Sequence, residues 1–454
     1  MGDNGSVQPE LLDIAKQVAS WANPGEQLEV YVADATETEV RAYQGEVESF
    51  TSARSQGIGV RAVANGRQGY AYAGTLERSA LTETLQEARD NAAFAEADEF
   101  NGVAVPDGVP AIDLNLCDAS LESFATADKI SLTIELERAT LGADPRVSGI
   151  ESAEYVDSQL QSAVATSTGI AIASRETGAY LASYAMAEAE GETQTGFGYS
   201  IARGPAELDV GAAATQAADR ATRLLGAVKP STSKLTVVLD PWVSAQLLGI
   251  IGATLNGDAV QRGRSFFADR IGEQVAVAEL CLLDDATNPE AFTAAAVDAE
   301  GLATRPNTLI NEGRLQGFLH NSYTARRSAT ASTGSAVRPG FKGAPGVGAQ
   351  ALALRPGQHS PEELIAGIDD GFLVQGVSGL HSGVNPISGD FSTGAEGLRI
   401  RNGALAEPLR EVTIASTLQR ILLDITAIGN DLVWLPMSAA GVSLVVADVM
   451  MSGT

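Results

Sequence analysis

The chain has 454 residues, of which 44% are hydrophobic and 19% charged, a composition typical of a folded globular protein with room for two or three domains. Its 57 acidic and 30 basic residues give a formal net charge of −27, which argues against nucleic acid as a partner and disfavours an anionic membrane surface. No apolar run reaches spanning length and the N-terminus lacks a signal-type pattern, so we expect a cytoplasmic protein.

The start of the chain has the pattern of a helix, a group of strands and a second helix. Apolar residues at helical spacing predict a helix over residues 11–22. Alternation over residues 27–72 then predicts an antiparallel meander with a hairpin turn at Asn65-Gly66. A helix over residues 76–97 has an apolar face that would cover this meander. Residues 102–117, interrupted by proline and glycine, are typical of a connector.

The same helix-then-meander plan follows a second time. Helical spacing predicts a helix over residues 127–142, and alternation returns over residues 147–200. Within that stretch Thr168-Gly169 and Thr177-Gly178 are predicted turns. A helix over residues 205–225 closes this half of the chain. We see no repeat at the level of residue identity, so the similarity lies in the plan alone.

The second half is richer in short strands. We expect a buried strand over residues 235–239 and a helix over residues 241–255, whose proline occupies the favoured first position. Short strands with glycine turns dominate from there to Ser416. An amphipathic helix over residues 417–428 and a strand over residues 442–450 complete the prediction.

Strand runs and helix runs are segregated along the chain, a pattern typical of an α+β fold with largely antiparallel sheets and covering helices. We expect a two-part chain that ends in a β-rich domain. The predicted divisions are an N-terminal α/β domain over residues 1–110, a central α+β domain over residues 111–228, and a β-rich C-terminal domain over residues 229–454.

The stretch from residue 381 to residue 400 has the composition of a functional loop. Between predicted strands at 372–377 and 396–400 it supplies polar side chains without helical period, among them His381, Ser382, Asn385, Ser388 and Asp390. The same stretch also fits a long hairpin connection whose polar groups form hydrogen bonds with one another. A nucleophilic triad is disfavoured because the sequence has no Gly-x-Ser-x-Gly elbow.

Three long stretches, in the same order, resemble the TldD/PmbA family on its TldE (PmbA)-like branch. They read NGDAVQRGRSFFADRIGEQV at 256–275, TRPNTLINEGRLQGFLHNSYTARRSATASTG at 304–334, and HSGVNPISGDFSTGAEG at 381–397, followed by RIRNGALAEPLREVTIASTLQRILLDITAIGND. The resemblance covers roughly the second half of the chain. It implies a heterodimer in which a zinc-bearing subunit cuts unfolded or small peptides inside an enclosed chamber.

The zinc motif of the active branch is absent from this sequence. By the resemblance, its His-Glu-x-x-x-His residues fall on Leu248, Gly249 and Ala253, none of which can ligate a metal or move a proton. The late cysteine ligand is also missing, because residues 429–440 contain no cysteine. We therefore expect no cofactor on this chain and zinc on a TldD-like partner.

The resemblance thus implies a TldE-like, non-catalytic subunit of a heteromeric metallopeptidase, with the polar loop residues at the chamber wall. The alternative is a stand-alone homodimer that binds peptides or proteins without cleaving them. Arg326, Arg327 and Arg338 either pair with the abundant carboxylates or grip a peptide carboxylate or a partner. The glycine-rich stretch 340–349 lacks a Gly-Lys-Ser/Thr ending, and we predict a mobile flap there.

Overall fold

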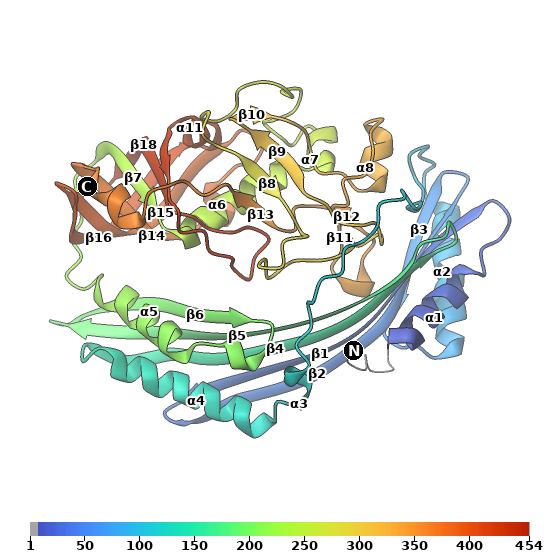
Figure 1. The fold of residues 1–454 in the computed structure, drawn as a ribbon, viewed down its shortest axis with the longest axis horizontal. Helices are drawn as coiled ribbons and strands as arrows, with labels where there is room; N and C mark the ends of the chain where they lie inside the picture. The colour runs from blue at the N-terminus through green and yellow to red at the C-terminus, as the bar shows by residue number, and fades with distance from the viewer. Residues whose placement is uncertain (1–7, 454) are drawn as a thin grey trace.

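A computed structural model describes residues 8–453 of the chain (Figure 1). The N-terminal half contains two units, each with three strands and flanking helices. The first unit consists of α1 (Gln8–Ala19), β1 (Glu26–Tyr43), β2 (Glu46–Ala64), β3 (Arg67–Ala73) and α2 (Arg78–Phe94). The second consists of α3 (Ser120–Ser123), α4 (Thr126–Ala143), β4 (Val147–Thr166), β5 (Ala171–Ala189), β6 (Glu192–Ala202), the 3-10 turn η1 (Pro205–Glu207) and α5 (Val210–Thr222).

The two units share one sheet. Its six strands follow the order β3-β2-β1-β4-β5-β6, and all neighbours are antiparallel. The junction is the pairing of β1 with β4, which runs without a break from Glu29 opposite Thr166 to Ala42 opposite Ala153. Figure 1 shows the long strands as one curved band, with α4 beneath it and the C-terminal elements above it.

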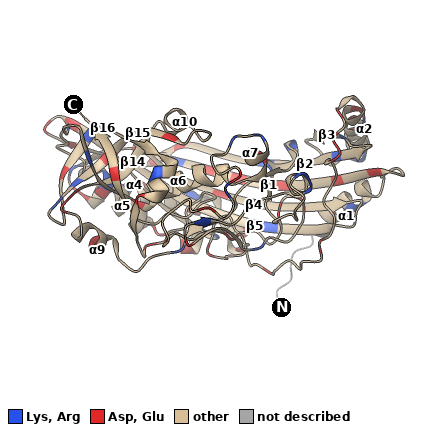
Figure 2. Ribbon diagram, turned by 90° about the horizontal axis from the view of Figure 1, so that it is seen from above, with Lys and Arg blue, Asp and Glu red and all other residues tan. Residues whose placement is uncertain are grey.

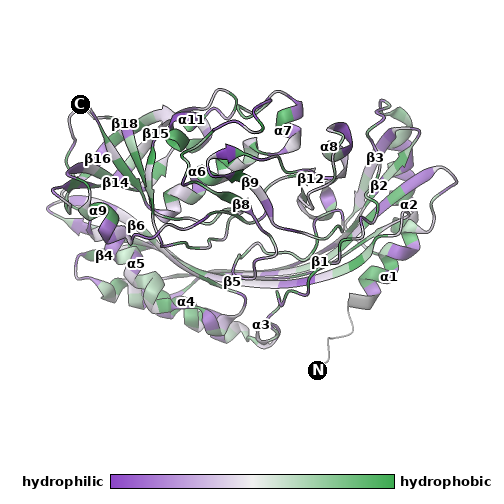
Figure 3. Ribbon diagram, turned by 45° about the horizontal axis from the view of Figure 1, so that its top comes forward, coloured by the Kyte–Doolittle hydropathy of each residue, from purple (hydrophilic) through white to green (hydrophobic). Residues whose placement is uncertain are grey.

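The alternation of side chains along β1 explains why helices cover one face of the long sheet and the C-terminal half covers the other. Leu28, Val30 and Val32 are buried in a core with residues of α1 and α2, and farther along the strand Val40 is buried with residues of α4 and α5. Tyr31 lies on the opposite face and packs against C-terminal residues that include Phe341. Figure 3 shows hydrophobic and hydrophilic segments alternating along α1 and α4, as expected of helices that bury one face.

The C-terminal half is built mainly from short strands. Its elements are β7 (Ser233–Leu239), α6 (Pro241–Thr254), α7 (Gly257–Gln261), β8 (Leu282–Asp284), β9 (Asn307–Asn311), β10 (Arg314–Leu315), α8 (Ser322–Arg327), β11 (Ala336–Val337), η2 (Gly340–Lys342), β12 (Gly346–Val347), β13 (Leu352–Leu354), α9 (Pro361–Ala366), β14 (Asp370–Ser378), α10 (Leu380–Gly383), β15 (Asp390–Arg401), β16 (Ala404–Thr417), α11 (Leu418–Leu423), β17 (Ile425–Ile428) and β18 (Leu444–Ser452).

A second six-stranded sheet organises this half, in the order β16-β15-β14-β7-β18-β17. Only β14 and β7 run parallel within it; the other pairs are antiparallel. Its apolar face encloses α6 in the largest hydrophobic core of the molecule, which includes Leu248, Ile251 and Phe372. The predicted α+β class with antiparallel sheets and a β-rich C-terminal domain is confirmed. Within residues 8–453, no helix is both long and apolar enough to cross a membrane.

Most predicted elements occur, with three corrections. Thr177-Gly178 is not a turn but the middle of β5, where Gly178 leaves room for the ring of Phe292; a Cβ there would lie 2.6 Å from that ring. The helix predicted over residues 417–428 ends at Leu423, because the residues after it form β17 and pair with β18. The strand predicted over 396–400 already begins at Asp390, since β15 pairs with β16 along that length.

Candidate functional site

Helix α6 carries the positions at which the resemblance predicts the lost metal ligands. Its start follows from local chemistry: Asp240 caps the helix by accepting a hydrogen bond from Trp242 N, and Pro241 occupies the first turn. Leu248 faces inward and is 1% exposed within the core. Gly249 and Ala253 lie on the open side of the helix, where a Cβ added to Gly249 would meet no atom within 4 Å. The open face of α6 therefore presents no ligating atom at these positions.

The three histidines lie on separate elements. His320 is buried, with Nδ1 3.2 Å from Thr324 Oγ1, and burial lowers its pKa. His359 is exposed and 3.7 Å from a carboxylate oxygen of Glu363. His381 is exposed on α10. Across residues 8–453, no three or more His, Cys, Asp or Glu side chains are grouped as a metal site requires. The donor set does not fit a catalytic zinc ion.

The predicted polar loop lies at the surface between β14 and β15. His381, Ser382, Asn385, Ser388 and Asp390 are all exposed there. Asn385 Oδ1 accepts from the backbone N–H of Ile387 at 2.9 Å, and Ser388 Oγ donates to Asp390 at 2.7 Å. Ser382 Oγ donates to the carbonyl of Gly379. The loop thus holds its own shape through these bonds, while its side chains stay open to solvent.

Two of the three arginines singled out in the sequence, Arg326 and Arg338, contact the N-terminal half. Arg326 on α8 donates to the carbonyls of Phe100 and Gly102, at 2.7 and 2.8 Å. Arg338 is buried, donates to Glu29 at 2.6 Å and lies over the ring of Tyr31. These two guanidinium groups connect the two halves of the chain, although Nη1 of Arg338 is buried without a hydrogen-bond partner among the described residues.

Arg327 and the glycine-rich stretch 340–349 are the remaining candidates from the sequence. The Arg327 side chain is exposed, and its Nη1 is 3.2 Å from Tyr323 Oη. Within 340–349, Phe341 is buried against the long sheet, and its carbonyl accepts from Tyr70 Oη at 2.8 Å. In this structure the stretch predicted to be a flap is therefore docked on β1, β2 and β3.

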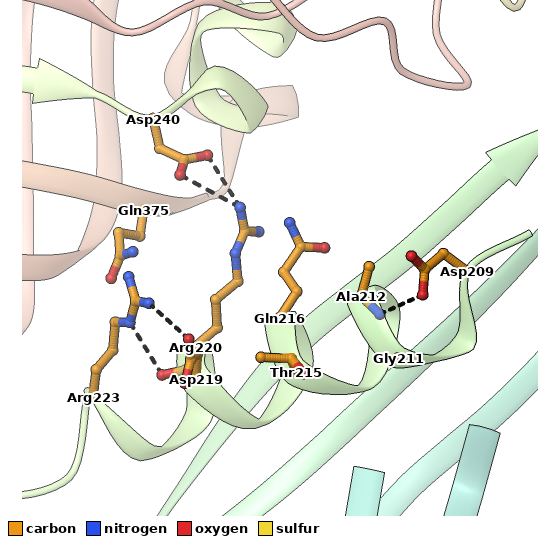
Figure 4. Close-up of a pocket in the computed structure, with 10 residues that line it drawn as sticks. All are labelled: Asp209, Gly211, Ala212, Thr215, Gln216, Asp219, Arg220, Arg223, Asp240 and Gln375. Atoms are coloured by element: carbon orange, nitrogen blue, oxygen red, sulfur yellow. Dashed lines mark hydrogen bonds and ion pairs between the residues drawn. The ribbon is translucent and has the colours of Figure 1, made fainter. Parts of the chain in front are cut away.

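A cleft of about 660 Å³, which sequence reasoning missed, lies between α5 and the C-terminal sheet (Figure 4). Arg220 reaches from α5 to Asp240, at 3.2 and 3.4 Å, and Arg223 pairs with Asp219 on its own helix at 3.6 Å. Burial raises the pKa of Asp240, although the Arg220 guanidinium opposes this shift. Gln375 points from β14 toward α5 in Figure 4. The cleft is polar and offers charged groups that are mostly paired.

Backbone irregularity places Gln375 in this cleft. The register of β14 against β15 shifts between Val374 and Gly376, which makes Gln375 the extra residue of a β-bulge. Gly397 is opposite, where a side chain would collide with the β14 backbone. Gln375 is 9% exposed and its Oε1 has no hydrogen-bond partner. A neighbouring cavity of about 270 Å³ continues along Gly376 and Ser378. A bulge cannot be recognised from alternation alone, so no signal in the sequence marked this site.

The charges of the molecule are spread over both halves rather than collected at one site (Figure 2). One buried group of charges stands apart from this distribution. Arg61 on β2 lies 2.5 Å from Glu29 on β1 and 3.0 Å from Glu300 in the C-terminal half, and Arg338 shares Glu29. Burial by itself would raise the pKa of the Glu29 carboxyl, but the two guanidinium groups hold it below its ordinary value. This network fastens the long sheet to the C-terminal half.

Three family models match the chain in order. They are PmbA/TldA metallopeptidase domain 1 over residues 28–92, the central domain over residues 119–225, and the C-terminal domain over residues 232–453. The chain is 28% identical over 431 residues to metalloprotease PmbA of Escherichia coli O157:H7, covering 94% of this chain and 92% of that protein. It is 24% identical over 385 residues to a metalloprotease TldD homolog of Haemophilus influenzae, covering 83% and 79%.

A solved structure of TldE from Thermococcus kodakarensis has the same fold, with a TM-score of 0.88 at 21% identity, covering 99% of this chain and all of that one. The matches to family models and curated relatives together span both halves of the chain, in agreement with the motifs in its sequence. The chain therefore belongs to the PmbA/TldD metallopeptidase family.

Proposed function

We propose that this chain is the non-catalytic, TldE-like subunit of a cytoplasmic heteromeric zinc metallopeptidase that processes unfolded or small peptides. The observation that carries the proposal is the face of α6. A peptidase zinc needs protein ligands, an open coordination position and a base that activates water. Leu248, Gly249 and Ala253 offer none of these. In the proposed complex, zinc and the cutting step belong to a TldD-like partner, and this chain contributes part of the chamber wall.

Relatives named PmbA, TldD and TldE support a division of labour within the family. We assign peptide contacts to the exposed loop between β14 and β15, because His381, Asn385 and Asp390 reach solvent from a backbone whose own hydrogen bonds hold it in place. Such contacts would position an extended peptide without selecting a particular sequence.

The test is co-expression with a TldD-like subunit of the same organism, followed by size-exclusion chromatography, metal analysis and a peptide-cleavage assay. We expect the two chains to elute together, the complex to contain zinc and cut peptides, and this chain alone to contain no stoichiometric zinc. Separate elution, with equal cleavage by the partner alone, would contradict the proposal. So would stoichiometric zinc and proteolysis by this chain without a partner.

A matched pair of histidine variants tests the loop. His381→Ala should raise the KM of the complex for a peptide substrate, because it removes a polar contact at the chamber wall. His359→Ala changes another exposed histidine, one that lies next to α9, and should leave the KM unchanged. Equal effects of the two variants would remove the loop from the peptide path while leaving the subunit assignment to the co-expression test.

A further inference from the structure

The polar cleft between α5 and the C-terminal sheet is formed by two walls from different halves of the chain. Residues of α5 and its two capping positions, Asp209 and Arg223, line one wall, and Asp240 and Gln375 line the other. At about 660 Å³ the cleft has the size of a small-molecule site, which is usually between about 300 and 1,000 Å³. Figure 4 shows Arg220 and Gln375 extending from opposite walls into the space between them. The cleft can therefore hold a small polar ligand.

The Gln375 side chain supplies a buried acceptor. The β-bulge between Val374 and Gly376 turns this side chain toward α5, and Gln375 is only 9% exposed. Its Oε1 accepts no hydrogen bond from any of the described residues. A buried polar atom without a partner destabilises a fold, and native proteins keep few of them. This acceptor is therefore positioned for an N–H group that comes from outside the chain.

The two arginines that line the cleft keep hydrogen-bond donors available. Arg220 bonds to Asp240 through Nη2 alone, at 3.2 and 3.4 Å, which is longer than the roughly 2.7–2.9 Å usual between charged groups. Arg223 uses Nε for the carbonyl of Asp219, at 3.1 Å, and Nη2 for the carboxylate of the same residue, at 3.6 Å. Since a guanidinium group has five N–H donors, Nη1 of each arginine has no partner among the described residues.

Charges of both signs line the cleft. The carboxylates of Asp209, Asp219 and Asp240 lie there together with the two guanidinium groups. A phosphate dianion would meet three carboxylates in a chain of net charge −27, and a polyamine would meet the two guanidinium groups. A ligand with one charge of each sign and no net charge avoids both repulsions. The ammonium and carboxylate groups of an amino acid or a short peptide have this combination.

We propose that this cleft binds an α-amino acid or a short peptide as a zwitterion. The ligand carboxylate accepts hydrogen bonds from Arg220 and Arg223, because the guanidinium fork suits carboxylate oxygens. The ligand ammonium group donates to Gln375 Oε1 and to the carboxylate of Asp240. That carboxylate keeps lone pairs after it accepts from Trp242 N and Arg220. Burial raises the pKa of Asp240, so a positive group beside it is favourable.

A second cavity gives room for the longer of these ligands. It has a volume of about 270 Å³ and is lined by Leu224, which follows Arg223, and by Gly376, which follows Gln375. A dipeptide can therefore extend past Gln375, whereas a single amino acid stays in the first cavity. The inference goes beyond the proposed function and concerns the chain by itself. It can hold or fail whether or not a partner subunit cuts peptides.

Calorimetric titration of the full chain with four small probes tests the ligand class. L-Alanine and L-alanyl-L-alanine carry both charges, whereas N-acetyl-L-alanine lacks the ammonium group and L-alaninamide lacks the carboxylate. At least one of the two zwitterions should bind, and both singly charged probes should bind more weakly than it by about tenfold or more. The zwitterion that binds more tightly identifies a free amino acid or a peptide as the occupant. The proposal is overturned if neither zwitterion binds, or if removal of either charge leaves the affinity unchanged.

A matched pair of arginine variants tests the location. Arg223→Met removes a guanidinium group from the cleft and should weaken binding of the zwitterion by about tenfold or more. Arg262→Met on α7 breaks an ion pair of the same i,i+4 spacing, with Asp258, away from the cleft and should leave the affinity unchanged. Gln375→Met keeps much of the side-chain volume, removes the buried acceptor and should also weaken binding. Equal affinities of the two arginine variants would overturn the proposal even if Gln375→Met failed to fold.

Discussion

The buried network between the two halves predicts that two ion pairs on the same strands contribute very differently to the free energy of unfolding. Arg61 and Arg54 both lie on β2, and each is 2.5 Å from a carboxylate oxygen of β1, Glu29 and Asp34 respectively. The side chains of Arg61 and Glu29 are 3% and 1% exposed, whereas that of Arg54 is 65% exposed. The two pairs therefore have the same contact distance but different solvent access.

Replacement by methionine keeps much of the side-chain volume and removes the charge. In Arg61→Met, Glu29 keeps Arg338 as its ion-pair partner, whereas the buried carboxylate of Glu300 loses the guanidinium that it pairs with. Breaking a buried pair in this way costs about 3–5 kcal/mol of unfolding free energy. Arg54→Met breaks a solvent-screened pair and should shift the unfolding transition little. Urea unfolding followed by circular dichroism measures both.

A second substitution separates lost charge balance from lost packing. Adding Glu300→Gln to Arg61→Met removes the orphaned carboxylate and leaves Glu29 paired with Arg338. The double variant should therefore recover part of the stability lost in Arg61→Met. The reasoning is refuted if Arg61→Met and Arg54→Met lower the urea midpoint equally, or if Glu300→Gln adds its full cost to Arg61→Met.

Three further predictions use other sites. Burial, and after it the neighbouring carboxylate of Glu300, raises the pKa of Asp298 from 3.8 to about 7. The folded protein is therefore less stable when Asp298 is ionised, and stability is lost as the pH rises from about 3.8 to about 7. Over that range the urea midpoint of Asp298→Asn should rise relative to that of the wild type. Gly249→Ala should raise thermal stability by about 0.5–1 kcal/mol, whereas Gly252→Ala should not, because its Cβ would lie 2.8 Å from Leu352. Arg326→Ala removes two hydrogen bonds to connector carbonyls and should cost about 1.5–3 kcal/mol in urea unfolding.

Local signals in the sequence predicted much of the fold. The hairpin at Asn65-Gly66 was predictable because both residues adopt positive φ, 51° and 73°, which asparagine and glycine tolerate best. The start of α6 was predictable because Asp240 and Pro241 form a cap and first turn within three residues. The prediction of a turn at Thr177-Gly178 was wrong because this glycine makes room for the ring of Phe292, which lies more than a hundred residues away in the sequence.

The candidate site was less predictable, because its contacts also join residues that lie far apart in the sequence. Arg338 pairs with Glu29 on β1, and Arg326 donates to the carbonyls of Phe100 and Gly102 after α2, so both roles depend on how the two halves meet. Gln375 reaches its cleft through a bulge that changes the register of β14. The surface position of loop residues such as Asn385 could be predicted from composition, because hydrogen bonds such as that from Ile387 N to Asn385 Oδ1 form within the loop itself.

The junction of β1 with β4 has a consequence during synthesis on the ribosome. Glu29 of β1 is synthesised more than a hundred residues before Thr166, its partner on β4, so one side of β1 has no neighbouring strand until then. At roughly 5–20 residues per second, this delay amounts to about 7–27 s. Throughout that interval the nascent first unit exposes an unpaired inner strand, so we expect it to be a binding site for ribosome-associated chaperones. Fragments that end before β4 should aggregate for the same reason.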